Sequence, residues 1–417
     1  MMLGWEFPPY ISGGLGTACF GITKALAKKG VEILFILPQI KGSERKSHVQ
    51  LMSANDFQSS ALPTLWKNIE FRHVDSVLRP YLDQRKYKTD FYGADRRIGK
   101  ATPSNSFSLT GNYGEDLLQE ALRYGQIVGG IAEAKNFDVI HGHDWMTVFA
   151  GIAAKRISRK PFIYHAHALE YDRSGENIDR NIYEIERIGM EQADHIIAVS
   201  HYTKQMIENR YGISSEKITV VHNAVNRDHP AELPFRKKRK GQKIVLFLGR
   251  ITFQKGPDYF IEAAHLVLKY LPNVTFVMAG AGDMQSRMIE RVAELGIGKN
   301  FHFLGFVSGI DIERIYSMSD LYVMPSISEP FGISPLEAML RDVPVIISRQ
   351  SGVAEVANTV LKVDFWDIRE LAHKIISVLT YPALSREMVI RSRESLDNIH
   401  WDYAADKIIS VYAHHTN

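Results

Sequence analysis

The chain has 417 residues, of which 45% are hydrophobic and 23% are charged, and this composition excludes a disordered protein and predicts two globular domains of roughly 200 residues each. Lys and Arg outnumber Asp and Glu by only 50 to 47, so no basic excess indicates a nucleic-acid partner. The single cysteine, Cys19, excludes an intrachain disulfide framework, no apolar run approaches the ~18 residues that span a bilayer, and a cytoplasmic location without membrane association is expected.

The first half of the chain alternates short apolar runs with amphipathic stretches, which is the pattern of a parallel sheet covered by helices. Runs rich in Ile and Val predict buried strands at Glu32–Pro38, Asp138–His143, Pro161–His167 and His195–Ser200. Helical periodicity predicts helices at Leu15–Lys29, Glu115–Lys135, Thr147–Ile157 and Tyr183–Gln192. The polar stretch Lys41–Thr110 is expected to be an insertion with one or two strands, of which Glu70–Val77 has the best pattern.

The same alternation restarts after a polar segment, Asp228–Gln242, whose basic run Arg236–Lys240 is typical of a linker. Strands are predicted at Ile244–Leu248, Val274–Ala279, Phe301–Leu304, Leu321–Met324 and Val345–Ile347. Helices are predicted at Tyr259–Lys269, Met284–Glu294, Ile310–Ser317, Pro335–Leu340 and Trp401–His414. The chain is therefore predicted to be of the α/β class, with doubly wound Rossmann-like domains at 1–225 and 240–399 and a last helix, 400–417, that returns to the first domain.

In open parallel sheets ligands bind beyond the carboxyl ends of the strands, and a glycine loop follows the first strand. Gly13 and Gly14 lie in S-G-G-L-G, ahead of a helix whose first N–H groups are available to an anion. Cys19 stands where a dinucleotide fingerprint requires glycine. We interpret the loop as part of a sugar or phosphate site, with a tight strand-to-helix turn as the alternative.

Two His-x-His pairs end neighbouring predicted strands, His141/His143 and His165/His167. Residues two apart on a strand face the same side, so a metal site is one interpretation of this cluster. Imidazoles that bind a polar ligand, and purely structural histidines, are the alternatives. Because the sequence contains no D-x-D triplet, we expect no metal.

In the second half, two cations and two glycines follow predicted strands. Arg250 and Lys255 come after Ile244–Leu248 and suit a pyrophosphate, Arg through its planar fork and Lys as a point charge; a solvated loop is the alternative. Gly280 and Gly282 follow the next strand and either admit a base or phosphate or only form a turn.

Two glutamates, Glu329 and Glu337, flank the start of a predicted helix. Ser334, Pro335 and Glu337 fit the cap, first and third positions of a capping box, which is a purely structural interpretation. The amides just before this cap would also be available to an anion, and Glu329 would point to the same place.

This stretch, E-P-F-G-I-S-P-L-E, resembles the paired-glutamate E-x7-E motif of family 4 glycosyltransferases. These are retaining enzymes of the GT-B fold, in which two Rossmann-like domains face each other across a cleft, and they are related to bacterial and archaeal glycogen synthases. The resemblance covers nearly the whole chain, because further motifs follow in the family's order: S-G-G-L-G, H-G-H-D-W, H-A-H-A-L-E-Y-D-R-S-G, A-V-S-H-Y-T, H-N-A-V-N, G-R-I-T-F-Q-K-G and A-G-A-G-D.

The resemblance implies a role for each matching residue. Glu337 would hold the ribose of the donor nucleotide, Glu329 would contact the donor sugar hydroxyls, and His167 would lie near the reacting carbon. Arg250 and Lys255 would neutralise the pyrophosphate. The other predicted donor-binding residues are Gly13, Gly14, Gly280, Gly282, Phe331, Gly332 and Ile333, and the predicted acceptor-side residues are His143, Asp144 and Trp145.

The expected activity is metal-independent transfer of a hexose, glucose in the first instance, from a UDP-, ADP- or GDP-sugar to a glycan or other hydroxyl acceptor, without a further cofactor. Ile11-Ser12 stands where starch synthases have a lysine before the glycine pair, which argues against an ADP-glucose-dependent polymerase, and Asn223-Ala224 replaces the Asn-Gly of many relatives. The alternatives are a glycoconjugate or polysaccharide glycosyltransferase, a nucleotide-sugar epimerase, and a non-catalytic binding protein.

Overall fold

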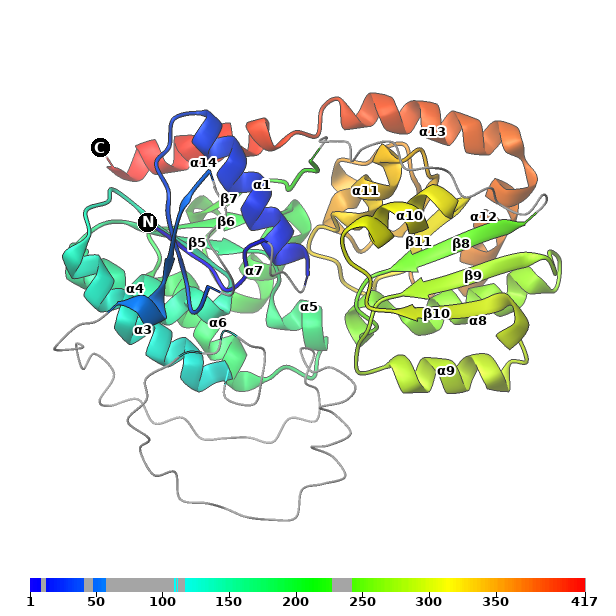
Figure 1. Ribbon diagram of the computed structural model, residues 1–417, viewed down its shortest axis with the longest axis horizontal. Helices are drawn as coiled ribbons and strands as arrows, with labels where there is room; N and C mark the ends of the chain where they lie inside the picture. The colour runs from blue at the N-terminus through cyan, green and yellow to red at the C-terminus, as the bar shows by residue number, and fades with distance from the viewer. Residues whose placement is uncertain are drawn as a thin grey trace, which may run out of the picture.

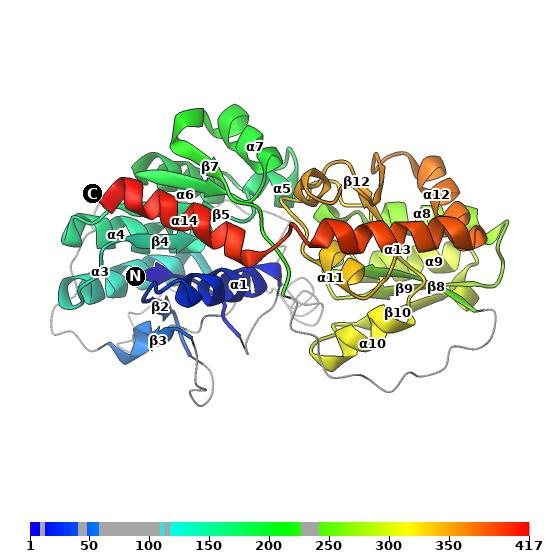
Figure 2. The ribbon, with the colours of Figure 1, turned by 90° about the horizontal axis from the view of Figure 1, so that it is seen from above.

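A computed structural model describes residues 1–8, 13–40, 48–57, 109, 111, 117–226 and 242–416. Two parallel sheets lie side by side, each covered by helices on both faces (Figures 1 and 2). Their strand orders are β3-β2-β1-β4-β5-β6-β7 and β10-β9-β8-β11-β12-β13. This confirms the predicted pair of doubly wound α/β domains. None of the helices in these ranges combines the length and apolar character that a membrane-spanning segment needs.

The first sheet is built from short strands, and its central ones are buried on both faces, as expected of a parallel sheet. Its strands are β1 (Met2–Leu3), β2 (Leu34–Leu37), β3 (Gln50–Ser53), β4 (Ile140–His143), β5 (Phe162–Ala166), β6 (His195–Ala198) and β7 (Ile218–Val220). The two residues of β1 lie in the middle of the sheet, since Met2 pairs with both Phe35 and His141. The strand predicted at Glu70–Val77 lies outside the described residues. β3 lies in the stretch Lys41–Thr110, for which one or two strands are expected, and β7 was not predicted.

Helices of the first domain pack on both faces of this sheet. They are α1 (Gly14–Lys28), α3 (Leu117–Ala134), α4 (Val148–Ser158), α5 (Glu170–Ser174), α6 (Arg180–Gln192) and α7 (His201–Tyr211). Leu26 and Ile22 of α1 belong to the core on one face, and Tyr124 of α3 belongs to the core on the other. Apolar residues at helical spacing therefore face the sheet, as the periodicity predicts.

The second sheet has its first strand, β8, at the centre. Its strands are β8 (Lys243–Leu248), β9 (Val274–Ala279), β10 (Phe301–Gly305), β11 (Leu321–Met324), β12 (Val345–Ser348) and β13 (Leu361–Val363). The helices are α8 (Pro257–Leu268), α9 (Gln285–Glu294), α10 (Ile310–Met318), α11 (Ser334–Leu340), α12 (Ile368–Thr380) and α13 (Pro382–Leu396). Because β8 pairs with β9 on one side and with β11 on the other, the loops that follow these three strands meet at one edge of the sheet.

The last helix, α14 (Trp401–Thr416), runs back along the first domain beside α1 (Figure 2). The Trp401 ring lies so close to Gly21 that a Cβ there would be 2.2 Å from it. Lys29 forms an ion pair with Asp406 at 2.7 Å, and Tyr412 bonds to His141 in the first sheet. The chain thus crosses between the domains twice, and the first of these crossings includes residues 227–241, outside the described ranges.

Candidate active site

The loops after β8 and β9 are pressed against each other. At Gly280, where φ is 142°, a Cβ would lie 1.8 Å from the Gly249 carbonyl oxygen, and at Gly282 it would lie 2.2 Å from that of Ile251. Both glycines are therefore required by the close approach of two backbones. This favours the turn interpretation of Gly280 and Gly282, and their predicted contact with the donor stays untested.

Gly13 and Gly14 have a different setting at the start of α1. Both are exposed, and within the described residues no atom lies within 4 Å of a Cβ added at either position. Packing among the described residues therefore does not explain these glycines, and their predicted contact with the donor stays a prediction.

Lys255 and Glu329 meet at the carboxyl edge of the second sheet. Lys255 ends a short turn, η4 (Phe253–Lys255), and its ammonium group forms an ion pair with the Glu329 carboxylate. Glu329 is only 5% exposed, and the Ser326 hydroxyl donates to the same carboxylate oxygen at 3.3 Å. The structure thus brings together two of the predicted site residues, 74 positions apart in the chain.

Arg250 lies on the same edge and is partly exposed. One of its guanidinium nitrogens donates to Gln254 Oε1 at 3.5 Å. The pKa of the nearby Asp283 carboxyl is raised by burial, while Arg250 opposes the rise. Arg250 and Lys255 therefore both lie in the loop that follows the central strand β8, as the sequence predicts.

The backbone between the paired glutamates turns sharply into α11. Gly332 has a φ of 95°, in the left-handed region that favours glycine. Among the described residues, the amides of Phe331, Gly332 and Ile333 have no hydrogen-bond partner. Three consecutive N–H groups thus precede α11, which is the arrangement that suits an anion.

The predicted capping box at α11 is wrong. Ser334 is already the first helical residue, and its hydroxyl accepts a hydrogen bond from Tyr322 at 2.8 Å instead of capping the helix. Glu337 accepts from the Tyr316 hydroxyl at 3.2 Å. Burial raises the pKa of Glu337, and Arg341 opposes the rise. Tyr322 and Tyr316, on neighbouring elements, thus bond to Ser334 and Glu337, and a local sequence pattern does not reveal such partners.

The four histidines form one buried cluster at the end of the first sheet. His143 pairs with His165 across β4 and β5. His141 Nε2 bonds to His165 Nδ1 at 3.0 Å, and His143 Nδ1 bonds to His167 Nε2 at 2.9 Å. Burial lowers the pKa of His141 and of His167 to about 3, so the imidazoles are neutral at physiological pH.

The geometry of this cluster is compatible with metal ligation. The ligand atoms of Cys19, His143 and His167 lie within 4.8 Å of one another, and so do those of His141, His143 and His165. The expectation that the protein uses no metal therefore stays a prediction.

The predicted acceptor-side residues lie below the surface. His143, Asp144 and Trp145 are 0%, 5% and 2% exposed. The Asp144 carboxylate accepts from the amide of His167 at 2.6 Å and from that of Ala168 at 3.2 Å. Burial raises the pKa of Asp144 to about 6, against the effect of Arg173 and the two amides. Asp144 thus holds the backbone that carries His167, and the acceptor-side assignment of His143, Asp144 and Trp145 stays a prediction.

The two domains touch beside Glu329, through residues that the sequence analysis did not select. Ser200 at the start of α7 donates to the Pro330 carbonyl at 2.6 Å. Glu355, in the turn η6 (Gly352–Glu355), accepts from the amides of His201 and Tyr202 at 2.9 and 2.8 Å. The motif A-V-S-H-Y-T contains these α7 residues, but only the fold reveals their partners.

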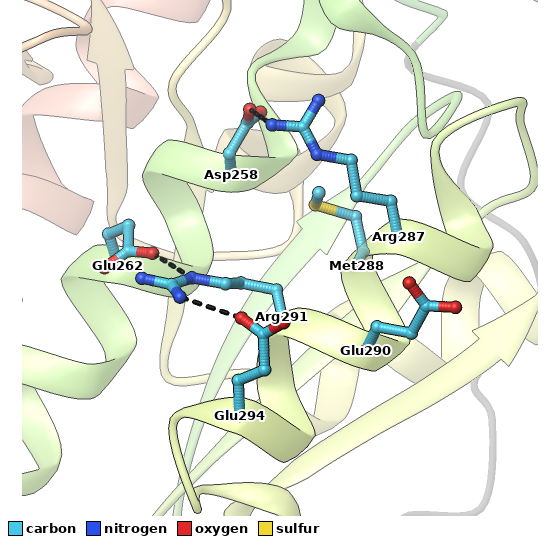
Figure 3. Close-up of a pocket in the computed structure, with 7 residues that line it drawn as sticks. All are labelled: Asp258, Glu262, Arg287, Met288, Glu290, Arg291 and Glu294. Carbon is cyan, nitrogen blue, oxygen red and sulfur yellow. Dashed lines mark hydrogen bonds and ion pairs between the residues drawn. The ribbon is translucent and has the colours of Figure 1, made fainter.

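The surface hollow in Figure 3 is not part of this site. It measures about 420 Å³ and lies between α8 and α9, lined by Asp258, Glu262, Arg287, Met288, Glu290, Arg291 and Glu294. Both of its arginines are paired, since Arg291 bonds to Glu262 at 2.6 Å and to Glu294 at 2.9 Å, and Arg287 lies 3.8 Å from Asp258. None of the predicted site residues lines it, and neither arginine is left without a carboxylate.

The chain is similar to known proteins over nearly its whole length. A family model described as "Glycosyl transferases group 1" matches residues 229–395, and one described as "Glycosyltransferase Family 4" matches residues 78–229. An uncharacterized glycosyltransferase of Methanocaldococcus jannaschii is 26% identical over 442 residues, covering 99% of this chain and 97% of the relative. A glycogen synthase of Mycobacterium tuberculosis is 25% identical, covering 99% and 94%. The sucrose-phosphate synthase of Thermosynechococcus elongatus has a similar structure, with a TM-score of 0.71, 19% identity, and coverage of 99% and 98%.

Proposed function

This chain belongs to the family 4 glycosyltransferases of the GT-B fold, which use nucleotide sugars, and we propose that it transfers a hexose, glucose in the first instance, to a glycan or other hydroxyl acceptor with retention of anomeric configuration. The glycogen synthase among its relatives supports a glucan-like acceptor.

The observation that carries this proposal is the ion pair of Lys255 and Glu329 at the carboxyl edge of the second sheet. Glycosyl transfer develops positive charge on the sugar and negative charge on the departing phosphate. A cation and an anion fixed side by side can stabilise these two opposite charges in the transition state. In the proposed complex Lys255 and Arg250 bind the pyrophosphate, and Glu329 binds the sugar hydroxyls.

The other proposed donor contacts come from both domains. The unpartnered amides of Phe331, Gly332 and Ile333 would bind the sugar and the distal phosphate, and Glu337 would bind the ribose. Gly13 and Gly14 would approach the phosphates from the first domain. His167, a neutral imidazole, would lie near the reacting carbon as a hydrogen-bonding group. Two cations and these amides meet the charge of the leaving group, so the proposal requires neither a metal nor a further cofactor.

A screen of donors tests the proposal. The protein is incubated with UDP-, ADP- and GDP-hexoses, with and without an α-glucan acceptor, and nucleotide release and glycosylated product are measured. The anomeric proton coupling in the NMR spectrum of the product reports retention or inversion. Lys255→Met is the comparison variant, and its activity is expected to fall.

The outcomes separate the candidate functions. Product that forms only with acceptors other than a glucan indicates a glycoconjugate or polysaccharide glycosyltransferase. Conversion of the nucleotide sugar without any acceptor indicates an epimerase. Tight donor binding without turnover on any acceptor would count against an enzyme of this kind, and an inverted product would refute the retaining mechanism.

A further inference from the structure

Helix α5 is a five-residue element whose side chains form buried ion pairs. Arg173 bonds to Glu170 at 3.1 Å and to Glu186 at 2.5 Å. Glu170 also accepts from the Ser174 hydroxyl at 2.6 Å. A helix locked in this way can hold a further side chain in a defined position, and that side chain is Asp172.

Asp172 is 1% exposed and points across the domain boundary. One carboxylate oxygen accepts from the amide of Leu169 at 2.8 Å, and the other accepts from the hydroxyl of Ser328, in the second domain, at 2.5 Å. Burial raises the pKa of Asp172 to about 6, so the carboxyl is mainly ionised at neutral pH. An ionised carboxylate only accepts hydrogen bonds, and Ser328 must therefore donate.

The direction of the next hydrogen bond follows. The Ser328 oxygen lies 3.0 Å from the Tyr202 hydroxyl at the start of α7. Because the proton of Ser328 is engaged with Asp172, Tyr202 must donate to Ser328. Tyr202 thus donates to Ser328, and Ser328 donates to Asp172. Of these three residues only Ser328 belongs to the second domain.

Glu329 stands between two residues that the first domain holds. Ser328 is bound by Asp172 and Tyr202, and the Pro330 carbonyl is bound by Ser200. Glu329 itself bonds within its own domain, to Lys255 and, through its amide, to the Gln350 carbonyl at 2.9 Å. The residues on both sides of this glutamate are therefore held from across the domain boundary, Ser328 by its side chain and Pro330 by its carbonyl.

The same helix region also reaches the loop of Lys255. A Cβ added at Gly175, just after α5, would lie 3.2 Å from the ring of Phe253, which begins the turn that ends in Lys255. The end of α5 thus contacts the loop of the cation while Asp172 contacts that of the anion.

We infer that Ser328, Asp172 and Tyr202 form an interdomain latch that sets the position of Glu329 and couples docking of the two domains to assembly of the donor site. This inference rests on the proposed function for the role of Glu329. In it, Ser328, Asp172 and Tyr202 are positioning residues, since none of them is assigned a contact with the donor.

Hydrogen–deuterium exchange of the intact protein tests the latch without any substrate. Ser328→Ala and Asp172→Asn should each increase exchange in the peptide covering residues 326–333 about fivefold, the scale for losing a hydrogen bond worth about 1 kcal/mol. Tyr202→Phe should have a smaller effect, because Ser328 keeps its bond to Asp172. Ser319→Ala is the matched control: Ser319 is a buried serine of the same domain, and its hydroxyl bonds to the Ile315 carbonyl at 2.6 Å.

Kinetics then test the positioning role. Ser328→Ala should lower kcat about tenfold with little change in donor KM, because a displaced glutamate affects the reacting geometry more than donor binding. Ser328→Thr keeps the hydroxyl and should stay within about threefold of wild type. Unchanged exchange in Ser328→Ala, or a kcat equal to that of Ser319→Ala, would overturn the latch. A wild-type protein that releases no nucleotide would instead refute the proposed function, while the exchange result still decides whether the latch exists.

Discussion

Replacement of Lys255 by Met removes one charge and keeps most of the apolar stem. In the folded protein the Glu329 carboxylate, 7% exposed as a side chain, would lose its cation and keep the Ser326 hydroxyl. Breaking a fully buried pair costs 3–5 kcal/mol, and the 20% exposure of the Lys255 side chain lets water offset part of this. We therefore expect a loss of about 2 kcal/mol in the free energy of unfolding, which lowers Tm by about 4–8 °C in a domain of this size.

The effect on the donor site is separate from this effect on stability. If Lys255 binds the pyrophosphate, Lys255→Met should weaken nucleoside diphosphate binding by about 10- to 100-fold, the scale of a lost charge-assisted hydrogen bond. Binding of the uncharged nucleoside should not change. Turnover should fall more, by about 10² in kcat/KM, because negative charge grows on the leaving group in the transition state.

Isothermal titration calorimetry with the diphosphate and the nucleoside provides the assay, and thermal melting of Lys255→Met with and without Glu329→Gln provides the control. The neutral Gln should restore most of the lost Tm, since no unpaired carboxylate remains. Equal affinity of wild type and Lys255→Met for the diphosphate would refute the phosphate assignment. It would leave Lys255 as a structural partner of Glu329 alone.

Three further predictions concern other groups. Activity should survive EDTA, because side chains and amides meet the leaving-group charge; loss of activity that a divalent ion restores would instead support metal ligation by the histidine cluster. Glu337→Gln should raise the donor KM about tenfold, which is the scale of one charge-assisted hydrogen bond. Its Tm should not change, because no capping box exists to be lost; unaltered donor kinetics would contradict the ribose assignment. Stability should also fall as pH is lowered from 6.5, because the unfolded chain protonates His141 there while the folded chain holds its pKa near 3. Lowering pH from 6.5 to 5 should cost about 2 kcal/mol for this group, so His141→Gln should show a shallower decline in Tm than His302→Gln, whose parent residue is exposed; parallel declines would refute this account.

Local pattern in the sequence determined the α/β class of both domains and most of their central strands. Ile- and Val-rich runs such as Ile244–Leu248 and Leu321–Met324 became central strands, because a parallel strand covered on both faces must be apolar along its length. The positions of Arg250 and Lys255 after one strand, and of Glu329 after another, followed from the same pattern, since polar residues at strand ends face the ligand edge.

Only the tertiary structure decided which side chains meet. The predicted capping box does not form, because Tyr322 and Tyr316, on other elements, bond to Ser334 and Glu337. Glycine is required at position 280 because a Cβ there would lie 1.8 Å from the Gly249 carbonyl oxygen. The contact of Asp172 with Ser328 joins residues 156 positions apart. Periodicity in the sequence indicates which face of an element is buried. A hydrogen bond between distant residues depends on how their two elements pack in the tertiary structure, and a local sequence pattern does not contain that information.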